Sequence, residues 1–294
     1  MDLCLVLTNG ELDQQTAAVQ YLLIVQQILS TLPAIKEQTL IRAKVPILRI
    51  RLQGPFAEMV VDLNANNSVA VRNTHLLCYY AFFDYRVRPL VLLVKEWAKQ
   101  KDINDSTRSS FTSYSLVLMV LHYLQVLEEP VLPSLQQLFP KRFHGRNDIR
   151  TLNLSHPLEE IPSESNFKGT NISSLGTLLI GFFDYYAHEY NYDTNAISIR
   201  LGREVQRCDV LHGTNTFWGP ICIEEPFTRS NTAHSIYDER VFNTIKQKFQ
   251  DAYEILSSTF DLNKLITIPP PLTPTVSLTD EQYYSHQTGF FQQH

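Results

Sequence analysis

The pattern of hydrophobic and polar positions divides the chain into a β-rich start and a longer helical part. Alternation is clearest where Leu48, Ile50 and Leu52 are separated by Arg49 and Arg51. Successive side chains of a strand point to opposite faces, so this spacing predicts a half-buried strand. The predicted strands or β-rich runs are 3–8, 40–52 and 58–66.

Most of the remaining chain has the three- and four-residue hydrophobic spacing of amphipathic helices. The predicted helices are 12–31, 73–85, 87–101, 112–128, 174–191 and 234–258. Polar residues and prolines dominate 140–173, which predicts loops. A small mixed β-sheet followed by a larger, mostly helical domain is an α+β architecture.

Composition excludes several classes of protein. The chain has 294 residues, of which 44% are hydrophobic and 19% charged, so it can bury a substantial core. Its net charge of −5 argues against coating nucleic acid or anionic membrane by bulk charge. Residues 35–108, however, carry 12 Lys/Arg and 7 Asp/Glu. That excess indicates either a focused anion site or chance clustering on solvated faces.

The cysteines and the N-terminus favour an intracellular protein. The four cysteines are far apart and form no C-x-x-C pair, which makes a disulfide framework or zinc knuckle improbable. No secretory signal and no apolar stretch long enough for a bilayer is expected. The nine histidines show no metal-ligand spacing, and no Walker A or G-x-S-x-G motif is found.

Two aspartates stand in predicted strands, where an unpaired carboxylate is costly. Asp2 opens an apolar strand, and Asp62 shares a strand face with Val60 and Asn64. A bound divalent cation would compensate the buried charge. Exposure at a strand end or sheet edge is the ordinary alternative.

Four blocks of sequence, in order along the chain, resemble template-independent nucleotidyltransferases. They are DLNANNSVAVRNT (62–74), RPLVLLVKEWAK (88–99), SYSLVLMVLHYL (113–124) and IEEPF (223–227). The resemblance is to cytoplasmic poly(A) polymerases of the germline-development type and covers roughly residues 2–262. It implies a partial nucleotidyltransferase catalytic domain at 1–67 and a helical central domain with a PAP-associated region at 68–265. The tail at 266–294 lies outside the resemblance, and its Pro-rich and then polar composition predicts disorder.

The resemblance implies Mg²⁺ or Mn²⁺ as the metal and ATP as the substrate. Asp2 and Asp62 match the second and third of the family's three metal-binding aspartates. The family's first aspartate and its Gly-Ser turn would stand upstream of Met1. We therefore expect Met1 to be the middle residue of an Asp-Met-Asp and the chain to be an N-terminally truncated form.

The same resemblance assigns residues to the triphosphate and the sugar. Lys95 and Lys99, one helical turn apart, match lysines that contact the triphosphate, and Ser113 matches a phosphate-binding serine. Asn73 and Thr74 match positions that contact the ribose. The residues alone allow simpler interpretations. Lys95 and Lys99 could form a solvated stripe on a helix, Ser113 could be a helix N-cap, and Asn73 and Thr74 could cap a helix.

Base recognition falls on three further residues. Tyr114 matches a tyrosine that stacks on the base, although it is also a candidate core residue. Glu225 orients the base or pairs with a neighbouring donor. Uridylating relatives tend to carry His four residues after the Phe of Glu-Pro-Phe, where this chain has Asn231, which favours ATP.

The resulting hypothesis is a poly(A) RNA polymerase that adds adenylates to mRNA 3′ ends with the help of a separate RNA-binding adaptor protein. Neither DNA nor a membrane is an expected partner. One alternative is a catalytically inactive nucleotide-binding or scaffold isoform, because one aspartate and the Gly-Ser motif are missing from the chain. The other alternative is a terminal uridylyltransferase.

Overall fold

A four-stranded mixed sheet forms the first part of the molecule. The computed structural model describes residues 1–8, 12–152, 167, 169–210 and 219–267. The strands are β1 (Asp2–Leu5), β2 (Ile35–Ile41), β3 (Ile47–Leu52) and β4 (Val60–Ala65), in the spatial order β1-β4-β3-β2. The edge strand β1 pairs in parallel with β4, and the other two pairings are antiparallel.

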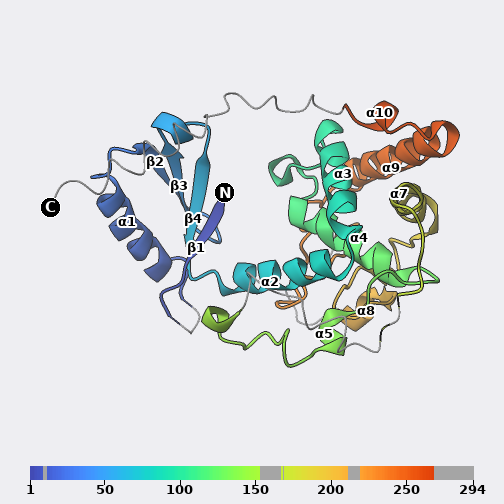
Figure 1. Ribbon diagram of the computed structural model, residues 1–294, viewed down its shortest axis with the longest axis horizontal. Helices are drawn as coiled ribbons and strands as arrows, with labels where there is room; N and C mark the ends of the chain where they lie inside the picture. The colour runs from blue at the N-terminus through green and yellow to red at the C-terminus, as the bar shows by residue number, and fades with distance from the viewer. Residues whose placement is uncertain (9–11, 153–166, 168, 211–218, 268–294) are drawn as a thin grey trace, which may run out of the picture.

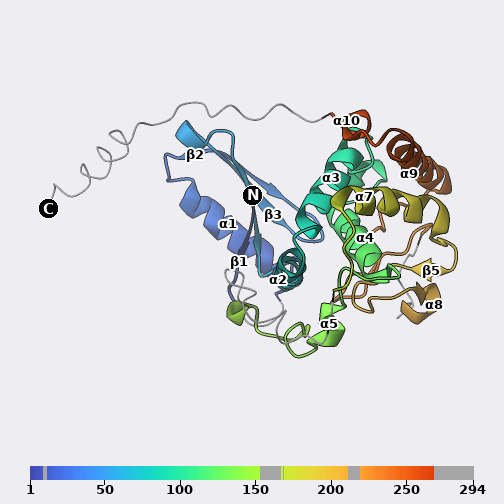
Figure 2. The same ribbon diagram turned by 45° about the vertical axis from the view of Figure 1, so that its right-hand side comes forward.

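One face of this sheet is covered by helix α1 (Ala17–Leu29) (Figures 1 and 2). Leu22 of α1 is fully buried, and it packs in one apolar cluster with Leu48 of β3 and Val61 of β4. The alternating strand pattern requires the intervening side chains to point to the other face. That open face carries the charged residues of β3 and β4.

The predicted run 40–52 is two strands rather than one. The chain turns between Ile41 and Ile47, which pair directly across the β2–β3 hairpin. The turn is 42–46 (RAKVP), and Pro46, which has no N–H to donate to a ladder, stands directly before β3. Strand β2 begins earlier than predicted, at Ile35.

Helices make up the second part. The α-helices are α2 (Ser68–Phe83), α3 (Val87–Gln100), α4 (Ser113–Val126), α5 (Leu135–Leu138), α7 (Leu175–Asp184), α8 (Arg207–Val210), α9 (Glu239–Thr259) and α10 (Leu262–Leu265). A π-helical stretch (Tyr185–Glu189) continues α7, three short 3₁₀ turns lie at 54–56, 106–108 and 149–151, and strands β5 (Asn195–Ala196) and β6 (Val205–Gln206) form a small hairpin. Figure 1 shows α2 running between the sheet and the bundle of α3, α4, α7 and α9.

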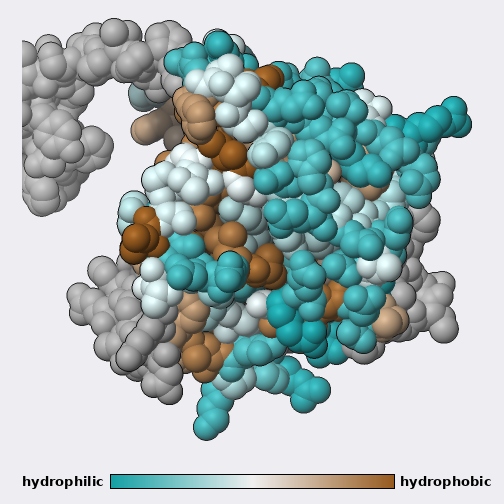
Figure 3. Space-filling view, turned by 90° about the vertical axis from the view of Figure 1, so that its right-hand side faces the viewer, coloured by the Kyte–Doolittle hydropathy of each residue, from teal (hydrophilic) through white to brown (hydrophobic). Residues whose placement is uncertain are grey.

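The helical part has its own core. Trp97 of α3 is fully buried between the rings of Phe183 and Phe249, with ring centroids 4.7 and 4.9 Å away. Edge-to-face packing of this kind adds to the stabilisation from burial itself. The face shown in Figure 3 is largely hydrophilic, and most of its hydrophobic side chains lie in a broken band toward the left of the view.

The architecture confirms the α+β prediction of a small mixed sheet beside a larger helical region. Among the described residues, no helix is both long and apolar enough to cross a membrane. Most of the predicted tail, from residue 268 onward, lies outside the described residues. The last described residues are anchored, because Thr267 and the side-chain amide of Gln100 exchange two hydrogen bonds of 2.8 and 2.9 Å.

Candidate functional site

Asp2 and Asp62 lie side by side on neighbouring strands. They are direct partners in the parallel β1–β4 register, and the Asp62 N–H donates to the Met1 carbonyl at 2.8 Å. Partners in register point to the same face, which here is the open face away from α1. Asp2 is exposed and Asp62 is partly buried. The strand pairing thus brings together the two predicted metal ligands.

Arg49 of β3 continues this row on the far side of Asp62. The two residues are register partners, and the guanidinium makes a bidentate pair with both carboxylate oxygens, at 2.8 and 2.7 Å. The hydrogen bonds from Arg49 lower the pKa of Asp62 below its ordinary 3.8. The same contacts raise the pKa of Arg49, with a smaller contribution from the charge of Asp2. The open face therefore presents two carboxylates and one guanidinium in a line.

This donor set fits one hard divalent cation. Mg²⁺ is usually held by one or two carboxylates together with substrate phosphates, and Asp2 and Asp62 supply two carboxylates. Within the described ranges, no group of three or more His, Cys, Asp or Glu side chains is placed to hold a metal ion. Asp62 would have to share its oxygens between the cation and Arg49.

A turn of asparagines links β4 to α2. Asn66 has a left-handed backbone (φ 51°), and its side-chain oxygen accepts from the N–H groups of Leu7 and Thr8 at 2.9 and 3.1 Å. Asn67 caps α2 by accepting from the Ala70 N–H at 3.3 Å. These contacts fix the end of β1 and the start of α2 relative to Asp62.

Helix α2 therefore begins five residues earlier than the predicted start at Asn73. Asn73 and Thr74 lie within the helix and do not cap it. The Thr74 hydroxyl donates to the Ala70 carbonyl at 2.9 Å, while the Asn73 side-chain oxygen is buried and finds no hydrogen-bond partner among the described residues. A buried acceptor left unpaired is costly, and a ligand hydroxyl would satisfy it.

Lys95 and Lys99 lie on one face of α3, which packs against α4. Lys95 is partly buried and Lys99 is exposed. Across the described part of the chain, no hydrogen bond or ion pair engages either ammonium group. Ser113 is the first residue of α4, but the N-cap is Thr112, and the Ser113 hydroxyl instead exchanges hydrogen bonds with the Asn104 side chain at 3.1 and 3.2 Å.

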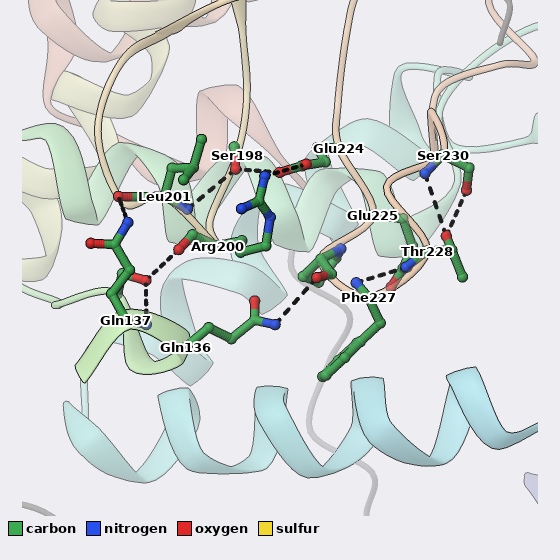
Figure 4. A network of polar contacts seen from close by, with 12 residues as sticks. Gln136, Gln137, Ser198, Arg200, Leu201, Glu224, Glu225, Phe227, Thr228 and Ser230 are labelled. Atoms are coloured by element: carbon green, nitrogen blue, oxygen red, sulfur yellow. Dashed lines mark hydrogen bonds and ion pairs between the residues drawn. The ribbon is translucent and has the colours of Figure 1, made fainter. Parts of the chain in front are cut away.

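The two residues predicted at the base meet each other. The Tyr114 hydroxyl donates to Glu225 Oε1 at 3.3 Å, and the second oxygen of Glu225 accepts from the backbone N–H groups of Phe227 and Thr228. Burial, and then the negative charge of Glu225, raise the pKa of Tyr114. Glu225 thus pairs with neighbouring donors and holds the Tyr114 hydroxyl. It also closes the turn that leads to Phe227 and Thr228 (Figure 4).

Asn231 is buried in the segment 221–233, the loop that also carries Glu225. Its side-chain oxygen accepts from the Ile223 and Ala233 N–H groups at 3.1 and 3.0 Å, and its amide nitrogen donates to the Ile221 carbonyl at 3.2 Å. These bonds hold the two ends of the 221–233 segment together. In this structure the Asn231 side chain builds the loop.

The loop is attached to the domain through Glu224. This carboxylate is fully buried, and it accepts from the Ser198 hydroxyl and from Arg200 Nη2, the latter at 2.7 Å (Figure 4). The Glu224 N–H also donates to the Ile197 carbonyl at 2.8 Å. Buried charges need such partners, so this network fixes the position from which Glu225 reaches Tyr114.

Comparison with known proteins places this arrangement in a family. Residues 1–82 match the family described as the central palm domain of mitochondrial-like poly(A) RNA polymerase, and residues 174–231 match the Cid1 family of poly(A) polymerases. A solved structure of a GLD-2/RNP-8 complex superposes with a TM-score of 0.79 at 54% identity, covering 92% of this chain and 80% of that chain. The chain belongs to the GLD-2-type poly(A) RNA polymerases.

Full-length GLD-2 relatives are longer than this chain. The chain is 48% identical to poly(A) RNA polymerase gld-2 of Caenorhabditis elegans, a match that covers 92% of the chain and 28% of that protein. It is 43% identical to GLD2 of Danio rerio, covering 90% of the chain and 52% of that protein. The chain thus spans about half, or less, of these relatives.

Two residues of this GLD-2-type site were not predicted in their observed roles. The sequence pattern assigns no partner to Arg49, which in the structure binds Asp62. The alternation of β3 placed it on the polar face, but the face alone does not reveal the partner across the strands. Asn66 was not singled out, although an Asn-Asn-Ser sequence directly after a strand is a signal for a turn and a helix start.

Proposed function

We propose that this chain is the catalytic part of a cytoplasmic poly(A) RNA polymerase. The reaction joins the 3′-hydroxyl oxygen of an mRNA to the α-phosphorus of ATP and releases pyrophosphate. The observation that carries the proposal is the register pairing of Asp2 with Asp62 on the open face of the sheet. In a GLD-2-type chain, that pairing supports Asp2 and Asp62 as the ligands of a divalent cation that acts on ATP.

Asp2 and Asp62 would hold Mg²⁺ or Mn²⁺, which when bound supplies positive charge to the triphosphate and to the attacking oxygen. Arg49 keeps Asp62 ionised, because its guanidinium stabilises the charged form of that carboxylate. Lys95 and Lys99 would neutralise the triphosphate from α3. Both ammonium groups suit this role, because no described side chain pairs with them.

The helical part would hold the rest of the nucleotide. Tyr114 offers a ring that Glu225 orients through the hydroxyl, so that the ring face remains for stacking on adenine. The unpaired buried oxygen of Asn73 can accept from a ribose hydroxyl, with Thr74 beside it. Ser113, whose hydroxyl points to the loop before α4, would donate to a phosphate in exchange for Asn104.

Domain division, partner and compartment are part of the same proposal. Residues 1–67 would form the catalytic domain and 68–265 the helical central domain, consistent with the separate cores of the sheet and the helices. A solved GLD-2 relative is a complex with RNP-8. We infer that this chain likewise works with a protein partner, an RNA-binding adaptor that brings it to mRNA.

Primer extension tests the function. The 294-residue chain is incubated with labelled oligo(A), Mg²⁺ and either ATP or UTP, beside the variants Asp62→Ala and Arg240→Gln. Arg240 is a fitting control because its side chain is 95% exposed and its nearest acidic oxygen is 3.9 Å away. Extension with ATP that disappears in Asp62→Ala and persists in Arg240→Gln supports the proposal. A preference for UTP contradicts the assignment of the base.

The contact of Arg49 with Asp62 favours one rival function. A carboxylate already neutralised by a guanidinium is a weaker metal ligand, so the chain on its own can be a nucleotide-binding module without catalysis. Binding of labelled ATP without any incorporation would establish that role. Loss of ATP binding in Lys99→Ala, measured in the same experiment, would show that the predicted triphosphate site is used in either case.

A further inference from the structure

One side of helix α3 carries three cations and an exposed leucine. Arg88, Lys95 and Lys99 are spaced by seven and four residues, so they lie on the same side of the helix, and Leu92 lies between them. Among the described residues, none of the three cations forms an ion pair. Figure 1 shows α3 on the side of the helical part that faces the sheet. These four residues are called the α3 face below.

One carboxylate lies at the margin of the α3 face. Glu96 accepts from the side-chain amide of Gln100 at 2.7 Å, and it forms no ion pair with a described cation. Three cations against one carboxylate leave the face with an excess of positive charge. Because Arg88 lies about 10 Å along the helix axis from Lys95, this charge extends beyond the two lysines assigned to the triphosphate.

The Arg88 end of the face is apolar and exposed. Leu92 is 63% exposed, and Phe82 at the end of α2 is 47% exposed. The Arg88 guanidinium lies over the Phe82 ring, 4.8 Å from its centroid. Apolar side chains next to unpaired cations suit a ligand that is both acidic and aromatic.

The described chain ends beside the opposite end of this helix. Thr267 and the side-chain amide of Gln100 are joined by two hydrogen bonds, of 2.8 and 2.9 Å. Gln100 directly follows Lys99 in α3. The residues after Thr267 therefore begin next to the lysines.

The sequence that begins there complements the α3 face. Residues 268–294 contain the acidic pair Asp280 and Glu281, no lysine and no arginine, and the pair is followed by Tyr283 and Tyr284. The order from acidic to aromatic matches the order along α3 from its lysines to its apolar end. The stretch from residue 267 to residue 280 can extend about 45 Å. That exceeds the length of α3, about 21 Å for its 14 residues.

We propose that residues 280–284 of this chain (DEQYY) dock on the α3 face and compete with ATP for its lysines. The two carboxylates pair with Lys95 and Lys99, and the two tyrosines cover Leu92 and Phe82. Attachment at Thr267 gives the segment a local concentration in the millimolar range, so a weak contact suffices. The competition rests on the proposed function, which assigns the triphosphate to the lysines, whereas the docking itself does not.

Photo-crosslinking locates the segment in the absence of ATP and metal. The photoreactive residue p-benzoylphenylalanine is placed at position 283 of the 294-residue chain, and mass spectrometry maps the adduct. We expect an intramolecular adduct within 82–99 that ATP suppresses. The double variant Asp280→Asn/Glu281→Gln should lose this adduct. Leu92→Ser, which changes neither lysine, should reduce it.

Filter binding of labelled ATP measures the competition. At low salt the double variant Asp280→Asn/Glu281→Gln should bind ATP about twofold to fivefold more tightly than the parent, and high salt should remove the difference. Leu92→Ser should also tighten ATP binding. Thermal melting verifies that each variant keeps its fold.

The matched control is Asp251→Asn/Glu254→Gln, which removes two exposed carboxylates from α9. It should keep the adduct and leave ATP affinity unchanged. If it tightened ATP binding as much as the change at 280 and 281, the effect would come from net charge, and the proposed contact would be wrong.

Two other occupants of the segment would overturn the inference. An adduct on α1 would place the segment on the sheet side, and an adduct that joins two chains would make the contact intermolecular. Equal ATP affinity in the parent and both tail and Leu92 variants would also overturn it. The proposed function fails by a different result, namely no primer extension with ATP in parent or variants while the adduct on α3 persists.

Discussion

Replacement of Arg200, which pairs with the buried carboxylate of Glu224, should destabilise the protein strongly. Glu224 has no exposed side-chain surface and Arg200 is 20% exposed, with 2.7 Å between Nη2 and Oε1. Arg200→Met would leave the carboxylate buried with only the Ser198 hydroxyl as a side-chain donor. Breaking a buried pair in this way costs about 3–5 kcal/mol. Because Arg200 is not wholly buried, we expect the lower end, about 3 kcal/mol, which corresponds to a decrease in Tm of roughly 6–12 °C.

A double-mutant cycle isolates the pair. Glu224→Gln removes the charge but keeps an acceptor, so it should cost less, about 1.5 kcal/mol. Arg200→Met combined with Glu224→Gln leaves no uncompensated charge and should cost about 2.5 kcal/mol. The coupling between the two positions is then about 2 kcal/mol.

Urea denaturation followed by circular dichroism measures each free energy of unfolding. The matched control is Arg240→Met, which removes an exposed arginine and should change stability by less than about 0.5 kcal/mol. The reasoning would be refuted if the double variant lost the sum of the two single losses in free energy of unfolding, within about 0.5 kcal/mol. In that case the Glu224 carboxylate would not depend on Arg200 for its burial.

Three further predictions concern the site and the core. Arg49→Gln should raise the pKa of Asp62 toward 3.8, which a carboxyl NMR titration would show. The stabilisation that Arg49 provides through Asp62 is present above the unfolded pKa of the carboxyl and is lost as pH falls through the lower folded pKa. The variant should therefore lose less free energy of unfolding than the parent when the pH is lowered below about 4. His122 is fully buried and has no hydrogen-bond partner within the described part of the chain, and burial lowers its pKa to about 3. The free energy of unfolding should therefore fall as pH decreases below the unfolded pKa near 6.5, by up to about 1.4 kcal/mol per pH unit, and urea titrations of His122→Leu should show a shallower pH dependence. Tyr114→Phe should keep ATP binding within a few-fold of the parent, whereas Tyr114→Ala should weaken it by about 5- to 150-fold in a filter-binding assay, the equivalent of roughly 1–3 kcal/mol of stacking.

Local patterns in the sequence predict the elements of this fold well. The alternation at Leu48, Ile50 and Leu52 describes the buried face of β3 as the structure has it, and long helices such as α3 and α4 are found within a few residues of their predicted bounds. The errors fall where short-range chemistry decides an end. The turn at 42–46 divides one predicted β-rich run into two strands, and the Asn67 cap starts α2 before the hydrophobic spacing becomes visible.

Contacts between distant segments are a different matter. Tyr114 and Glu225 are 111 positions apart in the sequence, and nothing in either segment specifies that a hydroxyl and a carboxylate will meet. Their meeting depends on how α4 packs and on the Glu224 network behind the loop. The same holds for Arg49, because its strand pattern fixes the face it occupies while the β3–β4 register selects Asp62 as its neighbour.

The line of Asp2, Asp62 and Arg49 explains how two carboxylates can stand together on an open sheet face. Partial burial acts to raise the pKa of Asp62, and protonation would remove a ligand that a cation needs. Arg49 opposes this effect, since it stabilises the charged form of Asp62 by two hydrogen bonds. A cation that enters the site therefore meets an ionised Asp62 and displaces no proton from it, but it competes with a guanidinium. Affinity for the metal is lowered by that competition, while its dependence on pH is reduced.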